Sequence, residues 1–299
     1  MEIREPERLT PVVAEADVVV VGSGPGGLSA AIAAARAGVS VILIERFGCF
    51  GGNITSVGVE GFAWYRHEKT IEAGGLAFEY EQRAIENNAA VPESQSKSYE
   101  LDSEAFKVVA DNLVLEAGVR PMLHRAFCSP ILEGNEIKGV ITESKAGREA
   151  IMGKIIIDAT GDADVARRSG VTVFKNSKED MISASVMFHM SGVNKEEFMD
   201  EIKRDPQKYS DWSDKNWQVQ TSGKEDDMFS PFLRKPFEKA KESGLIDSDL
   251  QTISGTWGAI HDSGELTYLN LVHLNGIDGT DPESLTKGEI EGRKAALEA

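Results

Sequence analysis

Residues 17–45 read DVVVVGSGPGGLSAAIAAARAGVSVILIE. The stretch begins with an apolar run, continues with three spaced glycines and an alanine-rich segment, and ends with a second apolar run. This order predicts a strand, a helix and a second strand. Gly22 allows a sharp turn out of the first strand, Gly24 lets the backbone approach a pyrophosphate, and Gly27 allows tight packing of helix on strand. The stretch therefore predicts a βαβ unit that binds a dinucleotide.

The acid that closes this stretch strengthens the interpretation. Glu45 ends the second apolar run, where a carboxylate accepts hydrogen bonds from the hydroxyls of a ribose. A 2′-phosphate would be repelled there, so NADP is not expected. The alternative, a glycine-rich turn in an ordinary α/β domain, explains the glycines but not Glu45. NAD and FAD both remain open on this stretch alone.

Composition and charge restrict the class of protein. The 299 residues carry 49 acids and 32 bases, a net charge of −17, with 41% hydrophobic residues. Such a chain repels phosphate backbones and anionic bilayers, so neither nucleic acid nor membrane is expected as a partner. The polar N-terminus and two cysteines predict a cytoplasmic protein without signal peptide or disulfide framework. A homo-oligomer remains possible.

The chain after Glu45 continues the α/β pattern. A glycine-rich loop occupies 46–66, a helix is expected from Asp102 or Ser103 to Gly118, and a third strand follows at 119–123. Turn signals then divide the chain into three short strands, expected at 127–132, 136–143 and 149–157. This β-meander leads into a second glycine turn within DATGDAD, residues 158–164.

The remaining sequence changes character. Alternating and helical patterns predict a second, sheet-containing domain. Its expected strands lie near 183–191, 251–260 and 265–274, and its expected helices at 194–204 and 231–244. We therefore expect two domains, residues 1–174 and 175–299.

Together these motifs resemble a known family. The stretches VVVVGSGPGGLSAAIAAARAG, ERFGCFGGNIT, LDSEAFKVVADNLVLEAGV, IIIDATGDADVARRSGV and ASVMFHMSGV cover most of residues 15–193. They are similar to the FAD-dependent oxidoreductases of the fumarate reductase or succinate dehydrogenase flavoprotein-like type. The resemblance implies an α/β fold: a Rossmann-like FAD-binding domain with an inserted β-meander, and an α+β cap or substrate domain. It also implies hydride transfer between flavin N5 and a small organic substrate that the sequence does not identify.

The resemblance also implies the contacts to FAD, position by position. The pyrophosphate would lie among the glycine-loop residues, the ribose at the acid after the second strand, the ribityl chain and flavin along the GGN loop, and adenine against the meander. These residues are Gly22, Gly24, Pro25, Gly26 and Gly27; Glu45 and Arg46; Gly51, Gly52 and Asn53; the backbone of Ala126 or Phe127; and Ala159, Thr160, Gly161 and Asp164 on the adenosine side.

The end of the chain departs from the family pattern. Family members continue past residue 299 with another strand and a glycine-rich turn near the flavin, so we expect a C-terminally truncated chain. The alternative function is a non-catalytic fragment or subunit that binds the ADP moiety of FAD or NAD. Thiazole synthase-like proteins share the N-terminal unit but have a smaller cap. Flavoproteins that modify transfer RNA share the fold, but the negative charge disfavours them.

The catalytic residues are unknown from sequence, and the candidates are weak. Arg66 and His67 follow the flavin-side loop, where such a pair holds a carboxylate and moves a proton. An exposed helix start explains the same pair. His273 and His261 fall in the predicted cap domain, whereas the alternating pattern favours His189 as a packed or hydrogen-bonded sheet residue.

Other reactive side chains point to packing. Cys49 lacks a neighbouring cysteine, which favours a small packed thiol over a redox centre, with Cys128 far away in sequence. Asp162 and Asp164 lack further ligands, so no metal site is expected. The four tryptophans are expected in hydrophobic packing.

Overall fold

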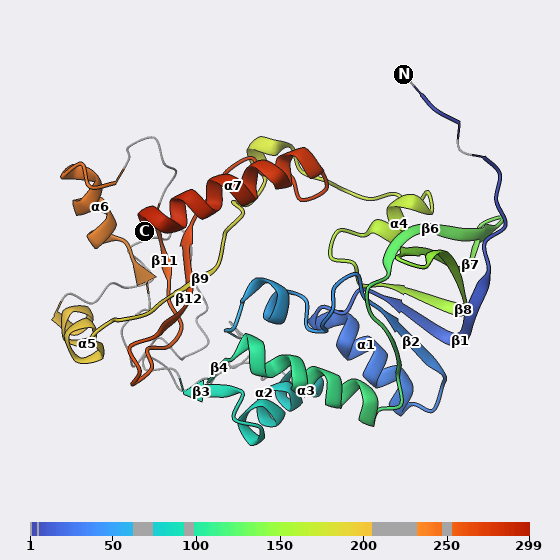
Figure 1. Cartoon of the computed structure of the whole chain (residues 1–299), viewed down its shortest axis with the longest axis horizontal. Helices are drawn as coiled ribbons and strands as arrows, with labels where there is room; N and C mark the ends of the chain where they lie inside the picture. The colour runs from blue at the N-terminus through green and yellow to red at the C-terminus, as the bar shows by residue number, and fades with distance from the viewer. Residues whose placement is uncertain (1, 5, 62–73, 93–98, 205–231, 247–252) are drawn as a thin grey trace. The chain divides into compact units, whose positions relative to one another are not determined.

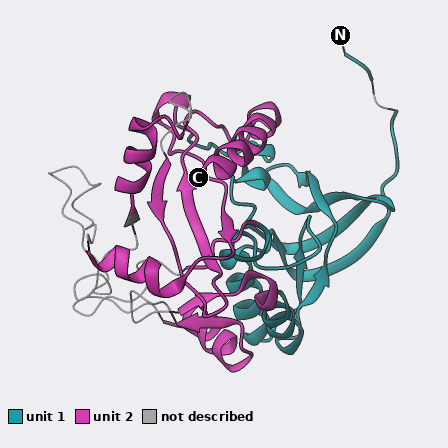
Figure 2. Ribbon diagram, turned by 60° about the vertical axis from the view of Figure 1, so that its left-hand side comes forward, with its two compact units in different colours: residues 1–56, 107–174 teal, residues 57–106, 175–299 magenta. Residues whose placement is uncertain are grey.

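The computed structural model describes residues 2–4, 6–61, 74–92, 99–204, 232–246 and 253–299. The chain forms two compact units, coloured separately in Figure 2. Unit 1 comprises residues 1–56 and 107–174, and unit 2 comprises 57–106 and 175–299. The step from 174 to 175 coincides with the expected boundary, whereas 57–106 groups with unit 2. The functional division into an FAD domain and a cap stays a prediction.

A six-stranded sheet forms unit 1, in the order β5-β2-β1-β8-β7-β6. The first four strands in this order pair in parallel, and β7 and β6 follow in antiparallel fashion. Strands β1, β2, β6, β7 and β8 of this sheet are labelled in Figure 1. Its parallel-dominated arrangement confirms the expected mixed α/β, Rossmann-like class. The strand bounds are Val12–Val21 (β1), Val41–Ile44 (β2), Arg120–Met122 (β5), Ala126–Glu133 (β6), Glu136–Ser144 (β7) and Gly147–Asp158 (β8).

The opening stretch folds as its pattern predicts. β1 pairs with β2 from Val18 opposite Val41 to Val21 opposite Ile44, and helix α1 (Pro25–Arg36) connects them. All four residues of β2 are buried, as expected for a parallel strand covered on both faces. On α1, Leu28 and Ile32 are fully buried one turn apart.

The strand that precedes the second glycine turn is longer than expected. The sequence predicts a short last meander strand at 149–157, but β8 is one strand of 12 residues. It pairs antiparallel with β7 over Gly147–Met152 and parallel with β1 up to Asp158. The last strand of the meander is therefore also the fourth parallel strand, which carries the turn after Asp158 to the carboxyl edge of the sheet.

Short elements complete the segments between these strands. The glycine-rich loop contains a five-residue π-helix, η1 (Asn53–Val57), which the sequence did not predict. Helix α3 (Ser103–Glu116) matches the expected helix. The other elements are α2 (Leu76–Glu86), β3 (Ala90–Pro92), β4 (Tyr99–Leu101), α4 (Asp164–Arg168) and the 3-10 helix η2 (Lys178–Asp180).

Unit 2 contains a four-stranded sheet in the order β10-β11-β12-β9. Leu269 on β12 and Trp257 are fully buried in its core, where Phe198 packs edge-on to Trp257 at 5.1 Å between ring centroids. Trp257 therefore packs as expected; the other tryptophans lie outside the described residues. The strands are Phe188–Met190 (β9), Phe232–Leu233 (β10), Ile253–Thr256 (β11) and Leu266–Val272 (β12), and the helices are Lys195–Arg204 (α5), Lys235–Glu242 (α6) and Pro282–Glu298 (α7).

Three expected elements of unit 2 are clearly shorter than their patterns, among them the strand expected near 251–260, which is β11 at Ile253–Thr256. The alternation over 183–191 yields a strand only at 188–190, preceded by an isolated bridge from Ala184 to Leu274. The expected helix over 231–244 shortens to α6, whose described start has Pro236 in its first turn. In the part of the chain that the structure describes, no helix is both long and apolar enough to cross a bilayer.

Candidate functional site

Two glycines of the first motif are required for packing, because a side chain at either position would clash with backbone atoms of the protein. A Cβ on Gly22, whose φ is +96°, would lie 2.3 Å from the carbonyl oxygen of Ala159. A Cβ on Gly27 would lie 2.0 Å from the carbonyl oxygen of Gly22. These glycines therefore allow β1, α1 and the turn after β8 to approach one another, as expected for a nucleotide-binding βαβ unit.

Gly24 is different because its missing side chain faces open space. A Cβ there would meet nothing within 4 Å, and its φ of −59° suits any L residue. Beside it, a Cβ on Gly52 would lie 2.6 Å from the Cα of Gly24, so the two glycine-rich loops touch at this point. We call this open side of Gly24, between Gly52 and the start of α1, the cradle; a ligand can approach the backbone there.

The N-terminus of α1 opens at the same place. Its first backbone hydrogen bond runs from the Leu28 N–H to the carbonyl of Gly24 at 2.9 Å. Within the described part of the chain no side chain caps this helix, and its first turn holds no acid. Uncapped N–H groups and the positive end of the helix dipole favour an anion such as a phosphate.

Glu45 is buried and tied to the glycine loop. Its Oε2 accepts hydrogen bonds from the backbone N–H of Ser23 at 2.9 Å and from the Ser23 hydroxyl at 2.6 Å. Its Oε1 accepts from the N–H of Phe47 at 2.9 Å. A carboxylate offers about four acceptor directions, so about one, on Oε1, remains for a ligand. The expected ribose contact thus has room for one hydroxyl.

The second glycine turn depends on a residue that the sequence analysis did not single out. Asp158, the last residue of β8, accepts from the N–H of Thr160 at 3.1 Å, from its hydroxyl at 2.7 Å and from the N–H of Ala166 at 2.9 Å. The N–H of Ala159 donates to the carbonyl of Val21 at 2.8 Å, which joins this turn to the end of β1. The available signal in the sequence was an acid directly before ATG, six residues before the start of helix α4.

The flavin-side loop is held by its own backbone. The N–H of Gly51 donates to the carbonyl of Ser23 at 2.9 Å, and the Thr55 hydroxyl donates to the carbonyl of Phe50 at 2.6 Å. Asn53 begins η1 directly after these glycines. Cys49 contacts the Thr55 hydroxyl at 3.7 Å, and both cysteines of the chain are free thiols.

Further predicted contacts lie at the start of the meander. Ala126 and Phe127 begin β6, and the N–H of Arg125 before them donates to the carbonyl of Glu45 at 2.9 Å. The acid after β2 and the residues expected at adenine therefore lie on adjoining backbone. Arg46 covers the ring of Phe47, 4.7 Å from its centroid. Asp164 is exposed at the first position of α4.

The structure describes only some of the residues considered as catalytic candidates. Arg66 and His67 lie outside the described residues. His273 Nε2 lies 2.7 Å from the carbonyl oxygen of Ser254 on the adjoining strand, a position suited to linking the two strands. Among the described residues no cluster of histidines, cysteines and acids suits a metal ion.

Unit 2 contains a polar cavity that the sequence did not predict. It measures about 150 Å³ and surrounds His189 on β9. His189 Nε2 lies 3.2 Å from Oε2 of Glu60, and Nδ1 lies 3.4 Å from Oε1 of Glu265. The Glu60 hydrogen bond raises the pKa of His189 above 6.5 despite partial burial. Burial would raise the pKa of Glu60, but His189 and the Ser103 N–H outweigh it and lower that pKa.

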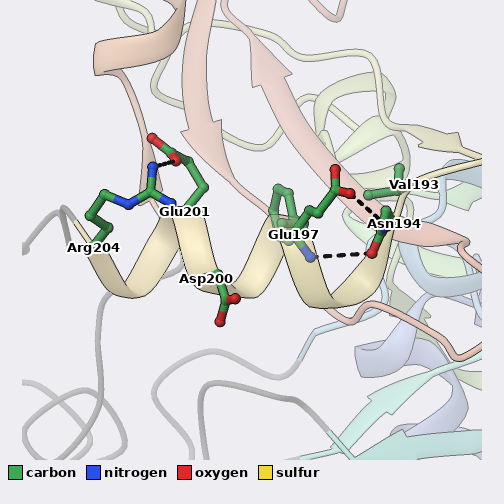
Figure 3. Close-up of a pocket in the computed structure, with 7 residues that line it drawn as sticks. Val193, Asn194, Glu197, Asp200, Glu201 and Arg204 are labelled. Atoms are coloured by element: carbon green, nitrogen blue, oxygen red, sulfur yellow. Dashed lines mark hydrogen bonds and ion pairs between the residues drawn. The ribbon is translucent and has the colours of Figure 1, made fainter.

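A second hollow of about 530 Å³ runs along α5. Figure 3 shows its side chains paired locally: Asn194 with Glu197 at one end, and Glu201 with Arg204 at the other. Asp200 points away from both pairs. The side chains serve helix capping and surface ion pairing, and they form no chemical centre.

Comparison with known proteins identifies the family. The family described as FAD dependent oxidoreductase matches residues 17–299, so the chain belongs to it. This confirms the FAD-dependent oxidoreductase resemblance and its cofactor, FAD.

Curated relatives match only parts of the chain. A thiamine thiazole synthase of Saccharolobus islandicus is 32% identical over 162 residues, which cover 50% of this chain and 57% of that protein. A dihydrolipoyl dehydrogenase of Chlorobaculum tepidum is 31% identical over 124 residues, 38% of this chain and 26% of the dehydrogenase. The chain thus spans little more than half the length of the first of these relatives.

Solved structures resemble the chain weakly. A geranylgeranyl bacteriochlorophyll reductase-like protein from Thermoplasma acidophilum has a TM-score of 0.44 and 21% identity, and covers 60% of this chain and 48% of its own. At that score the likeness bears on neither substrate nor mechanism.

Proposed function

We propose that this member of the FAD-dependent oxidoreductases transfers hydride between FAD and a small organic substrate, with unit 1 holding the ADP half of the cofactor. The observation that carries the proposal is the open cradle at Gly24, beside the uncapped start of α1. The residues there fit a pyrophosphate, because N–H donors and space coincide and no carboxylate competes in the first turn. The fumarate reductase-like subtype remains a prediction.

The residues around the cradle define how the cofactor would be bound. Glu45 would accept one ribose hydroxyl on Oε1 while Ser23 and Phe47 hold its carboxylate in place. Gly51 and Gly52 would pass close to the phosphates and the ribityl chain, since Gly52 already touches Gly24. The backbone of Ala126 and Phe127 would face adenine. Ala159, Thr160 and Gly161 would close the adenosine side.

FAD, when bound, supplies the two-electron chemistry by accepting or donating hydride at its N5. The protein must then orient a substrate and handle one proton. The thiamine thiazole synthase relatives align with half of this chain. That likeness supports nucleotide binding and gives no ground for transferring their named reaction.

The test uses the chain purified without added flavin and then reconstituted with FAD. We expect flavin absorbance that remains after gel filtration, and bleaching of that absorbance when a substrate is added without oxygen. Retained FAD with no bleaching by any member of a broad substrate panel would instead favour a non-catalytic nucleotide-binding subunit. Failure to retain or rebind FAD would refute the proposal.

A further inference from the structure

Phe47 is a large apolar side chain that the fold of unit 1 leaves at the surface. It stands two residues after Glu45, in the loop between β2 and η1. Phe47 is 44% exposed, whereas Phe50 in the same loop is only 2% exposed. A single exposed apolar side chain is ordinary on a protein surface, and what distinguishes this one is its neighbours.

The backbone of Phe47 is fixed at both of its polar groups. Its N–H donates to Oε1 of Glu45 at 2.9 Å, and its carbonyl accepts the N–H of His124 at 3.1 Å. A Cβ on the next residue, Gly48, would lie 2.8 Å from Cε1 of His124, so the loop packs against that ring. The side chain of Phe47 therefore extends from an anchored backbone, and a ligand that binds it has little loop to order.

The loop that carries Phe47 is hydrogen-bonded to both places where the adenosine of FAD is expected. Oε1 of Glu45, which accepts the Phe47 N–H, keeps an acceptor for a ribose hydroxyl. The carbonyl of Glu45 accepts the N–H of Arg125 at 2.9 Å. Ala126 and Phe127, whose backbone would face adenine, follow at once as the start of β6. Phe47 thus lies beside the expected ribose and base.

One face of the Phe47 ring is covered by a planar cation. Cζ of the Arg46 guanidinium lies 4.7 Å from the ring centroid. At that distance the positive charge is attracted by the electrons of the ring, which helps to hold both side chains in place. Since Phe47 nevertheless remains 44% exposed, its ring keeps surface for a second flat group.

A nucleobase is the flat group that such a surface suits. Bases stack on aromatic rings and on guanidinium planes because each partner offers a planar π-face. Adenine is uncharged at neutral pH, so a ring backed by a cation does not repel it. An aliphatic side chain of similar size would bury area against the base but would offer no such face.

We propose that Phe47 is a further cofactor-contacting residue, on whose ring the adenine of FAD stacks, with Arg46 on the opposite face of that ring. Phe47 then recognises the face of the base, while Glu45 binds the ribose. Every atom that carries this inference belongs to unit 1. The inference rests on the proposed binding of FAD and adds to it the residue that selects for a stacked base.

The test compares Phe47→Trp, Phe47→Leu and Phe47→Ala in the full chain. Flavin fluorescence gives the affinity for FAD, and competition gives the affinity for ADP. Phe47→Trp should bind both within about twofold of the wild type, because it keeps an aromatic face, whereas the leucine and alanine variants should bind both about tenfold more weakly. Full affinity in Phe47→Leu would show that the ring is only an apolar cover, and full affinity in Phe47→Ala would show no contact. Either result overturns the proposal.

Leu132 provides a matched control. It is also 44% exposed, but it lies near the end of β6, beside the turn to β7, whereas the residues expected at adenine begin that strand. Leu132→Ala removes a similar exposed apolar side chain and should leave the affinities for FAD and ADP unchanged. If it weakened them as much as Phe47→Ala does, the loss would be a general effect of surface truncation, and the proposal would be overturned.

A second measurement uses the wild-type chain and so does not depend on how a variant folds. With ADP bound, nuclear Overhauser effects should connect the adenine protons to the ring protons of a phenylalanine, and they should be lost in Phe47→Trp. Binding of FAD and ADP without these signals overturns the stack and leaves FAD binding intact. A chain that binds neither ligand refutes the proposed function, and the stack with it.

Discussion

Individual glycines in the first motif perform different tasks that their spacing does not distinguish. Gly22 and Gly27 are required because backbone oxygens occupy the space of a Cβ. Gly24 is not, since its side-chain position is open and its backbone angles are ordinary. Substitution at each position therefore separates folding from cofactor binding.

Replacing Gly24 with valine should weaken FAD binding by at least tenfold and leave the free energy of unfolding within about 0.5 kcal/mol of the wild type. The added side chain begins in open space, because a Cβ at Gly24 meets nothing within 4 Å apart from its chain neighbours. Flavin fluorescence titration and urea unfolding measure the two effects. Gly22→Ala is the contrasting variant, because it should unfold the protein more easily. Normal FAD affinity in Gly24→Val would contradict the cradle.

Glu45→Gln should destabilise unit 1 by about 1–3 kcal/mol, because a buried amide cannot accept all three hydrogen bonds from Ser23 and Phe47. Urea unfolding of the protein without FAD measures this loss. Since FAD is absent, a loss of stability comes from the hydrogen bonds between Glu45 and the glycine loop, and not from a contact with ribose. An unchanged free energy of unfolding would contradict the hydrogen bonds described.

At the scale of helices and strands, sequence patterns predicted some elements and missed others. The βαβ unit, α3 and the meander were predictable because each has a local period and clear turns. The length of β8 was not, since a strand shared between parallel and antiparallel partners has no pattern of its own. The pairing of Glu60 with His189 was equally hidden, because it joins two segments far apart in sequence.

Asp158 stabilises the turn between β8 and α4 by accepting hydrogen bonds from Thr160 and Ala166. Asp158→Ala removes acceptors for Thr160 and Ala166, so the start of α4 should loosen and stability should fall by about 1–3 kcal/mol. Asp162→Ala, at an exposed position of the same turn, is the matched control and should have little effect. Thermal unfolding compares them. Equal stabilities of the two variants would show that Asp158 does not hold the turn.

The pair of His189 and Glu60 should make stability depend on pH. Because the pKa of His189 is raised in the folded state, its stabilising contribution is fully present below pH 6.5 and is lost as the pH rises through the folded pKa. Because the pKa of Glu60 is lowered in the folded state, its stabilising contribution is present above pH 4.5 and is lost as the pH falls through the folded pKa. The contribution of the pair should therefore be largest between these values. Thermal unfolding across pH should show this maximum in the wild type and a flatter profile in His189→Gln. Identical profiles would contradict the ion pair.

At the scale of the whole molecule, family membership was predictable and the substrate was not. Nucleotide-binding glycines recur in fixed order, so residues 17–45 carry the family signal over a short distance. Of the candidate site, the glycines and Glu45 could be named, because backbone geometry dictates them. The cavity around His189 could not, since long-range packing of unit 2 assembles it.

Bound FAD should stabilise the molecule by mass action if unit 1 holds its ADP half. At a free FAD concentration a hundred times the dissociation constant, the gain is about 2.7 kcal/mol. ADP alone should give a gain that saturates in the same way, whereas NADP should give less because Glu45 repels a 2′-phosphate. Thermal shift measurements with each ligand test this. Stabilisation by NADP equal to that by FAD would contradict the role of Glu45.

The central claim is that the cradle at Gly24 holds the pyrophosphate of FAD, and a competition titration tests it most directly. FAD is bound to the purified chain, and ADP is then added while flavin fluorescence is followed. We predict that ADP displaces FAD in the wild type, and that Gly24→Val binds both ligands at least tenfold more weakly although it remains folded. Binding of FAD that ADP does not affect, or that Gly24→Val retains in full, would contradict the account.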